Sequence, residues 1–181
     1  MRPPRPEMSN TTPAPVNVPR KPATPVRVSA RLWLLSVVVG LGAMVFRVLN
    51  REDQLAYLRR TAGEVEGSVP QADVDTVALV AFWGTIGLLV IVFLVQAILI
   101  GPLQRGDGWT RWVYLGLLVP NLLGLVLASA TLTDDFAGLQ LTPLLLVAQM
   151  LLAVVALLAA LLPASTRWFR DVRTERRKAL G

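Results

Sequence analysis

Residues 77–100, VALVAFWGTIGLLVIVFLVQAILI, decide the fold of this chain. No charged residue occurs in these 24 positions. A helix rises about 1.5 Å per residue and a bilayer core requires about 20 apolar residues, so the stretch is long enough to cross a membrane. It therefore predicts a transmembrane helix.

The rest of the chain repeats this pattern three times, at residues 32–49, 112–132 and 139–162. Among these stretches only the first carries a charge, Arg47, near its end. The sequence predicts an all-α integral membrane protein, with a four-helix bundle in residues 31–163 and an outer loop at residues 50–76. Gly101 and Pro102 are expected to end the second span.

The segments between the spans alternate in charge. Of the 18 Lys and Arg residues, 14 lie in the N-terminal tail, the second connection and the C-terminal tail, whereas residues 50–76 hold six acids and three Arg. Because cytoplasmic segments retain Lys and Arg, we expect both termini to be cytoplasmic. Arg outnumbers Lys 16 to 2, which is typical of GC-rich bacterial genomes, so the expected location is a bacterial inner membrane.

The composition argues against several kinds of site. The chain has no Cys and no His, which removes disulfides, Cys/His zinc sites and Ser–His–Asp or Cys–His nucleophiles. All twelve acids lie in tails and loops, so no carboxylate stands in a span, where proton-coupled carriers commonly place one. We expect no catalytic residue, metal, cofactor or small-molecule substrate. The net charge of +6 suits anionic lipid headgroups, not nucleic acid.

Both tails are basic. Residues 1–30 are rich in proline and are expected to be disordered, either as a solvated tail that enforces topology or as a docking arm. Residues 164–181 are expected to form a helical extension, with Trp168 and Phe169 on the membrane surface. Its candidate contacts to lipid headgroups or a partner are Arg167, Trp168, Arg170, Arg173, Arg176, Arg177 and Lys178.

Apolar residues recur every seven positions in and before the outer loop, at Val48, Leu55, Ala62 and Val69. The repeat predicts a short amphipathic extracytoplasmic helix that continues from the first span and ends at residues 68–70. This helix would either lie on the outer end of the bundle or offer its apolar face to a larger partner. The candidates for docking are Val48, Leu55, Leu58, Ala62 and Val65.

Small residues at helical spacing predict close helix packing on two spans. They are Ser36, Gly40 and Ala43 on the first span, and Gly116, Pro120, Gly124 and Ala128 on the third. The polar residues inside the spans are Gln96, Asn121 and Gln149, expected at different depths. Asn121 would bond to the backbone freed by Pro120 or to a neighbouring span, or it would contribute to a polar substrate path.

Two stretches carry a resemblance to known proteins: residues 47–58, RVLNREDQLAYL, and residues 108–112, GWTRW. With them and its four-span plan, the chain resembles small four-span membrane proteins of actinobacteria, and among these the Luc-type accessory proteins of mammalian-cell-entry (Mce) lipid transporters. The resemblance implies a noncatalytic subunit that stabilises or regulates a larger envelope transporter. It carries over no catalytic or binding residue.

These observations favour a non-catalytic accessory or stabilising subunit of a larger bacterial inner-membrane complex, with an Mce-type lipid transport system as one candidate. The expected partners are membrane lipids and the other subunits. The alternatives are a small transporter or channel that acts as an oligomer, and an accessory subunit of a respiratory complex. An enzyme that uses Asp134 and Asp135 on lipids is disfavoured, because neighbouring aspartates in a tight loop are usually solvated turn residues.

Overall fold

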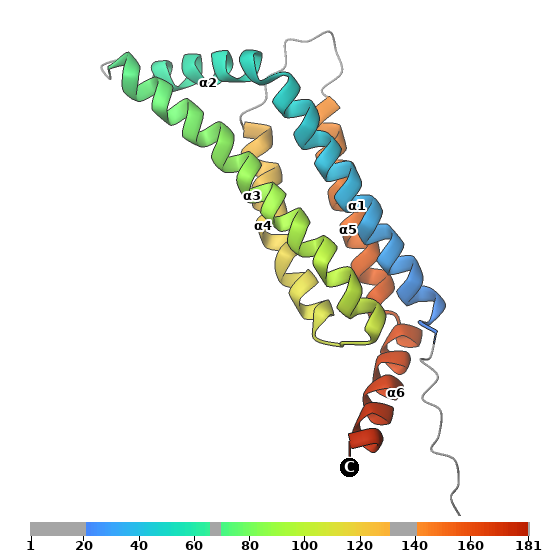
Figure 1. Ribbon diagram of the computed structural model, residues 1–181. Coiled ribbons are helices and arrows are strands. Elements are labelled where there is room, and N and C mark those ends of the chain that lie inside the picture. Colours follow the sequence, from blue (N-terminus) through green and yellow to red (C-terminus); the bar gives the residue numbers. More distant parts are fainter. Residues whose placement is uncertain (1–20, 66–69, 131–140, 181) are drawn as a thin grey trace, which may run out of the picture.

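The computed structural model describes residues 21–65, 70–130 and 141–180, without the side chains of residues 61–65, 71, 129, 130, 179 and 180. The described residues form six helices: α1 (Thr24–Leu49), α2 (Arg51–Val65), α3 (Gln71–Arg105), α4 (Thr110–Ala130), α5 (Leu141–Leu161) and α6 (Pro163–Leu180). Four of them, α1, α3, α4 and α5, are long and apolar enough to cross a membrane. The predicted four-helix membrane bundle is confirmed (Figure 1).

The four spanning helices form a ring. α1 packs against α5 and α3, and α4 packs against the same two helices. The start of α1, the α3–α4 connection and α6 lie at one end of the bundle, and α2 lies at the other (Figure 1). We call these the basic end and the α2 end. The segments that are richest in Lys and Arg therefore share one end of the molecule.

α1 begins seven residues before the predicted start of the membrane domain. The prediction that residues 24–30 are disordered is wrong, because they form the first turns of α1 and pack on the bundle. Pro25 lies in the first helical turn, where its missing N–H leaves no acceptor unpaired. Val26 and Ala30 are buried, and Ser29 Oγ donates a hydrogen bond to Ala156 O at 2.7 Å. Residues 1–20 lie outside the described residues, so for them the prediction of disorder stays a prediction.

The seven-residue repeat predicted that the helix of the outer loop continues from the first span. This prediction is wrong, because α2 is separate from α1. The chain leaves helical geometry at Asn50, at φ −100° and ψ 27°, where the backbone N–H and the side-chain Nδ2 both donate to Phe46 O. α2 then runs across the end of the bundle (Figure 1). The turn brings the apolar side of α2 against α3, and Arg59 of α2 forms an ion pair with Asp75 of α3 at 2.8 Å.

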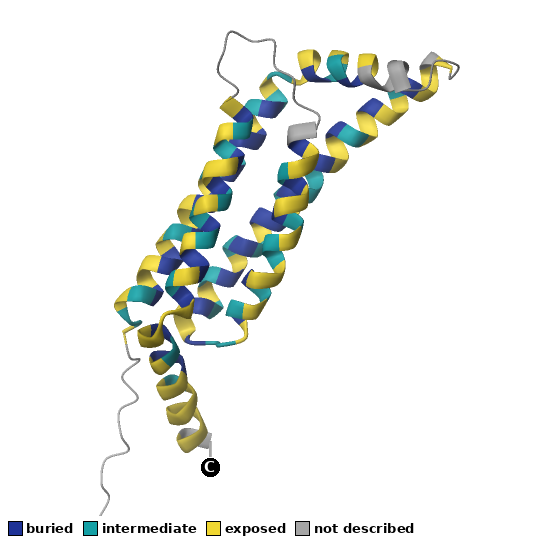
Figure 2. Cartoon of the chain, turned by 180° about the vertical axis from the view of Figure 1, so that it is seen from behind, coloured by how far each residue is buried: buried dark blue, intermediate teal, exposed yellow. Residues whose placement is uncertain are grey.

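Two buried apolar clusters fill the bundle. The cluster nearer the α2 end includes Phe82 and Phe93 of α3, and the other includes Trp33 of α1 and Tyr114 of α4. The rings of Trp33 and Tyr114 stack with 4.0 Å between centroids, which joins two helices that face each other across the ring. Figure 2 shows buried positions along the inward sides of the helices and exposed positions outside. The outward apolar side chains are the surface that lipid would contact.

α3 continues through Gly101 and Pro102, so the prediction that this pair ends the span is wrong. The next residue, Leu103, is fully buried in the cluster around Trp33, and this burial favours a further turn of helix. The helix ends at Gly106, whose φ of 89° suits a residue without a side chain. Its N–H donates to Leu103 O.

Candidate functional site

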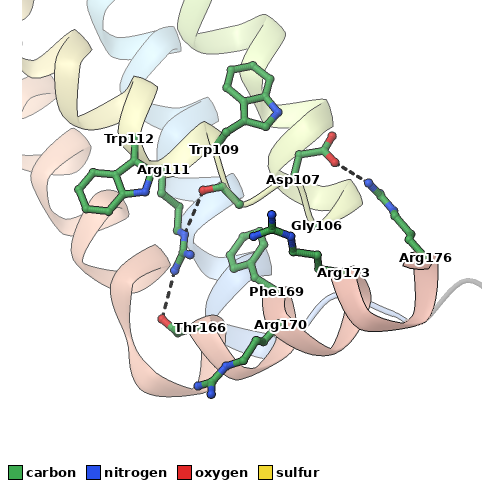
Figure 3. A pocket seen from close by; sticks show the side chains of 11 residues that line it. Gly106, Asp107, Trp109, Arg111, Trp112, Thr166, Phe169, Arg170, Arg173 and Arg176 are labelled. Carbon is green, nitrogen blue, oxygen red and sulfur yellow. Dashed lines mark hydrogen bonds and ion pairs between the residues drawn. The ribbon is translucent and has the colours of Figure 1, made fainter. Parts of the chain in front are cut away.

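A pocket of about 560 Å³ opens at the basic end, between the α3–α4 connection, the first turn of α4 and α6 (Figure 3). Its charged lining residues are Arg111, Arg170, Arg173, Arg176 and Asp107. Four cations thus surround one carboxylate. The three predicted contacts from the C-terminal tail that line this pocket are Arg170, Arg173 and Arg176. Arg167, Arg177 and Lys178 are exposed on α6 but do not line it.

One apolar side of α6 holds this helix against the bundle. Trp168 and Phe169 are only 8% and 4% exposed, so the prediction that they lie on the membrane surface is wrong. Val172 Cγ1 lies 2.8 Å from the position that a Cβ would take on Gly106. The glycine that ends α3 therefore also makes room for α6. This packing turns the arginines of α6 toward the pocket and the solvent.

Arg111 is fixed in the wall of the pocket by three contacts (Figure 3). Its Nε donates to Gly108 O at 3.4 Å, and its Nη1 donates to Thr166 Oγ1 at 3.1 Å. Its guanidinium lies over the ring of Phe169, 4.6 Å from the centroid, in a cation–π contact. Because Thr166 and Phe169 belong to α6, Arg111 links α4 to α6.

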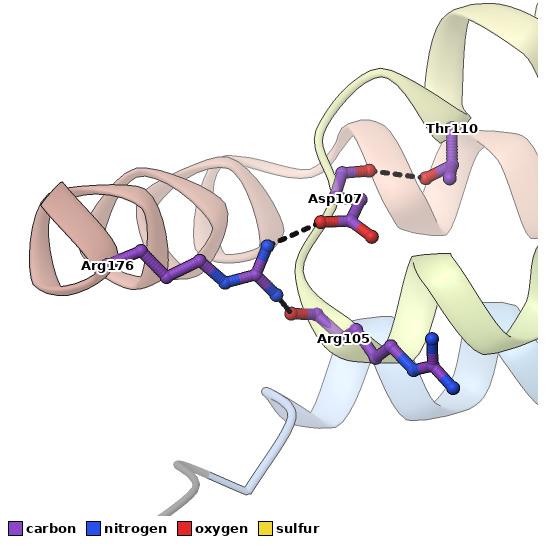
Figure 4. A network of polar contacts seen from close by, with 4 residues as sticks. All are labelled: Arg105, Asp107, Thr110 and Arg176. Carbon is purple, nitrogen blue, oxygen red and sulfur yellow. Dashed lines mark hydrogen bonds and ion pairs between the residues drawn. The ribbon is translucent and has the colours of Figure 1, made fainter. Parts of the chain in front are cut away.

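Arg176 fixes the opposite side of the pocket (Figure 4). Its Nη1 donates to Asp107 Oδ1 and its Nη2 donates to Arg105 O, both at 2.6 Å. Asp107 O also accepts a hydrogen bond from Thr110 Oγ1 at 2.7 Å. The ion pair is partly exposed, so it contributes about 1 kcal/mol or less to stability. Its larger effect is that the Asp107 carboxylate already pairs with Arg176 and does not pair with the other arginines of the pocket.

Arg170 and Arg173 complete the charge of the pocket. Both are exposed, and no described residue forms an ion pair or hydrogen bond with either guanidinium. Trp109 and Trp112, 54% and 69% exposed, also line the pocket. Guanidinium groups bind phosphate and carboxylate oxygens in a bidentate manner. The arrangement can therefore bind an anion beside exposed aromatic rings.

A second polar site lies inside the bundle. Gln149 Nε2 donates to Ser36 Oγ at 3.2 Å and to Asn121 Oδ1 at 3.4 Å. Ser36 Oγ donates to Gln149 O at 3.1 Å, and Asn121 Nδ2 donates to Leu117 O at 3.1 Å. All three side chains are buried. We call them the polar cluster; it joins α1, α4 and α5. The expectation that the polar residues of the spans lie at different depths is therefore wrong for Asn121 and Gln149.

Gln96 forms no hydrogen bond to the polar cluster. Its backbone carbonyl accepts a hydrogen bond from Tyr114 Oη at 2.8 Å. The side-chain amide is fully buried, and neither its nitrogen nor its oxygen has a hydrogen-bond partner among the described residues. The residue thus joins α3 to α4 through its backbone.

The small residues of α1 lie in contact with the neighbouring helices. Ser36, Gly40 and Ala43 are all buried. A Cβ added to Gly40 would lie 2.5 to 2.9 Å from three ring atoms of Phe93. Only a residue without a side chain lets α1 approach α3 this closely.

The small residues of α4 divide into two pairs. Gly124 and Ala128 are buried, and the side chain of Leu89 occupies the space beside Gly124. Pro120 is half-buried, Gly116 is exposed, and no atom lies within 4 Å of the position of a Cβ on Gly116. Only the half of this stripe nearer the α2 end therefore packs inside the bundle.

The docking candidates with described side chains are turned inward. Leu58 of α2 is buried, and Leu55 of α2 and Val48, in the last turn of α1, pack against the same apolar cluster. They hold α2 on the bundle and are not a free docking surface. Ala62 and Val65 lie in α2, but their side chains are outside the described residues. Asp134 and Asp135 are also outside them.

Sequence reasoning missed Asp107 and Arg111 as parts of one site, because the site exists only when α6 folds back on the α3–α4 connection. The spacing of Trp168, Phe169 and Val172 was the available signal, since it marks an apolar side on a basic helix. Within the described parts of the chain, no group of three or more acidic residues could hold a metal ion. Comparisons of the chain with protein-family models, curated proteins and solved structures found no match.

Proposed function

We propose that this chain is a non-catalytic accessory or stabilising subunit of a larger bacterial inner-membrane complex, with both termini in the cytoplasm. The observation that carries the proposal is the polar cluster of Ser36, Asn121 and Gln149. Polar groups inside a membrane protein either mark a path for a substrate or hold helices together. Here they bond to one another across three helices, which supports a structural role.

The same cluster disfavours the alternative of a small transporter or channel. That alternative requires Asn121 and Gln149 to face an open path. Instead, Asn121 bonds through Nδ2 to its own helix and through Oδ1 to Gln149, and both side chains are buried. A substrate that entered would have to break these bonds in an apolar environment, where an unpaired polar group costs about 1–3 kcal/mol.

The outward side of α2 is the surface best suited to a partner protein. Arg51, Glu52, Asp53 and Arg60 of α2 are exposed. α2 itself is held on α3 by buried Leu58, so these charges stand on a fixed helix. Charges of both signs on a fixed surface confer partner specificity through electrostatic complementarity. An Mce-type lipid transport system or a respiratory complex would supply such a partner.

Extraction of the tagged full-length protein from its native membrane in a mild detergent tests the proposal. We expect it to purify with at least one other integral membrane protein in a fixed ratio. Reversing two charges, Glu52→Arg with Asp53→Arg, should release that protein. Arg167→Glu with Arg177→Glu, which reverses two charges at the opposite end, is the control and should retain it. A lone protomer under every extraction condition would overturn the proposal.

A further inference from the structure

We propose that the basic-end pocket binds the phosphate group of an anionic phospholipid. Arg170 and Arg173 would supply cations that no described residue pairs with, and Arg111 would supply a fixed one. This inference does not depend on the accessory role, because it rests on the pocket and on the apolar surface beside it.

The charge of the pocket is the first argument. Arg176 occupies Asp107, which leaves three guanidinium groups without a carboxylate among the described lining residues. The pocket lies between the C-terminus of α3 and the N-terminus of α4, whose dipoles oppose each other, so its positive charge comes from the arginines. These arginines favour an anion, and the fork of a guanidinium matches two phosphate oxygens.

Preorganisation is the second argument. Arg111 is already held by Thr166, Gly108 and the ring of Phe169, so binding would not require it to be ordered. On the far wall, Arg176 Nη2 donates to Arg105 O, a bond that does not involve the Asp107 carboxylate. A site whose walls are fixed before the ligand arrives loses less entropy on binding.

The position of the pocket identifies a lipid as the source of the phosphate. Trp109 and Trp112 are exposed at the ends of the spans, and Trp side chains prefer the depth of the lipid headgroups. An exposed apolar stripe then runs from the pocket along α4, through Trp112, Leu115, Val119 and Leu122. A phospholipid could place its phosphate in the pocket and an acyl chain along this stripe. Free phosphate would use only the pocket.

Gly116 lies next to this stripe and is not used by the bundle. It is exposed, and nothing lies within 4 Å of the position of its missing Cβ. The space where its side chain would stand is open, one helical turn from Trp112. An acyl chain that follows the stripe would pass over Gly116. The glycine would then contact the lipid, whereas it contacts no other described helix of the bundle.

Native mass spectrometry of the full-length protein in detergent tests the assignment, with phosphatidylglycerol, phosphatidylcholine and inorganic phosphate as separate probes. We expect one phosphatidylglycerol to bind more tightly than phosphatidylcholine. The double substitution Arg170→Gln with Arg173→Gln should weaken that binding at least about tenfold, because two charge-assisted contacts are lost. Arg167→Gln with Arg177→Gln removes the same charge from α6 outside the pocket and should change the affinity less than about twofold.

Three results would overturn the inference. Equal losses in the two double variants would mean that general surface charge attracts the lipid. Equal binding of phosphatidylcholine and phosphatidylglycerol would mean that the pocket does not select an anionic lipid. Displacement of the lipid by an equal concentration of inorganic phosphate would assign the pocket to a soluble phosphate. Circular dichroism of each variant checks that α6 remains folded.

Discussion

The polar cluster and the basic-end pocket differ in what their polar groups bind. Inside the bundle, Ser36, Asn121 and Gln149 bond to each other and to the backbone. In the pocket, Arg170 and Arg173 have no partner among the described residues. A buried polar group must be paired to avoid a cost of about 1–3 kcal/mol, whereas an exposed guanidinium stays hydrated until a ligand arrives. The first region therefore serves folding and the second serves binding.

The largest effect is expected inside the bundle, where α1 and α3 pack closely at Gly40. Gly40→Val places carbon atoms where the buried ring of Phe93 lies, so α1 and α3 must separate. We expect a loss of about 3 kcal/mol of stability, toward the upper end of overpacking effects. Thermal unfolding in lipid-free detergent measures it. Gly42→Val is the matched control, since Gly42 is exposed and nothing lies within 4 Å of its Cβ position.

Gly106→Ala tests the packing of α6 beside the pocket, because α6 lies against this glycine. A side chain at φ 89° costs about 1–2 kcal/mol, and the added Cβ would meet Val172 at 2.8 Å. We expect α6 to detach more often and to be cleaved faster by a protease added to the detergent-solubilised protein. Gly108→Ala should leave the cleavage rate unchanged, since its Cβ would meet only Arg111 Nη2 at an ordinary 3.7 Å. Equal rates in both variants would show that Gly106 does not seat α6.

Gln149→Leu tests whether the polar cluster serves folding. The substitution removes two side-chain hydrogen bonds and leaves Asn121 Oδ1 without its donor. Hydrogen bonds between membrane helices contribute about 0.6 kcal/mol on average and up to about 1.7, so we expect a loss of about 1 kcal/mol. Gln104→Leu, at an exposed position of α3, is the control for the same change of side chain. An unchanged unfolding temperature for Gln149→Leu would remove the structural role.

The smallest effect is expected at the ion pair that closes the pocket. Asp107→Asn weakens the contact to Arg176 and removes the carboxylate that the described lining residues place among four arginines. Stability should fall by less than about 1 kcal/mol, because the pair is partly exposed. The affinity for phosphatidylglycerol should rise slightly, since Arg176 becomes available to the phosphate. A fall in affinity in the mass-spectrometric titration would contradict the assigned role of Asp107.

The membrane bundle could be predicted from the sequence because each span is a long apolar stretch that can be recognised without its neighbours. Residues 77–100 need no knowledge of their neighbours to be recognised as a span. The basic segments likewise predicted which connections share an end. Local rules failed where tertiary packing decides. Pro102 looks like a helix end, but buried Leu103 continues α3, and Ser29 looks like part of a tail until its bond to α5 is known.

The two sites could not be predicted because each depends on the register between helices that are far apart in the sequence. Ser36 and Gln149 meet because α1 and α5 pack side by side, and nothing in either span alone fixes that register. The pocket depends on the angle at which α6 leaves α5. The sequence showed that α6 is basic, but its apolar side, which seats it, was assigned to the membrane surface.

One measurement tests the central contrast most directly: thermal unfolding of three full-length proteins in detergent, with and without phosphatidylglycerol. The account predicts that Gln149→Leu unfolds at a lower temperature than the wild type but gains the same increment from the lipid. Arg170→Gln with Arg173→Gln should unfold at the wild-type temperature without lipid and gain almost nothing from it. The reverse pattern, or a common loss of both properties in both variants, would contradict the division into a folding site and a binding site.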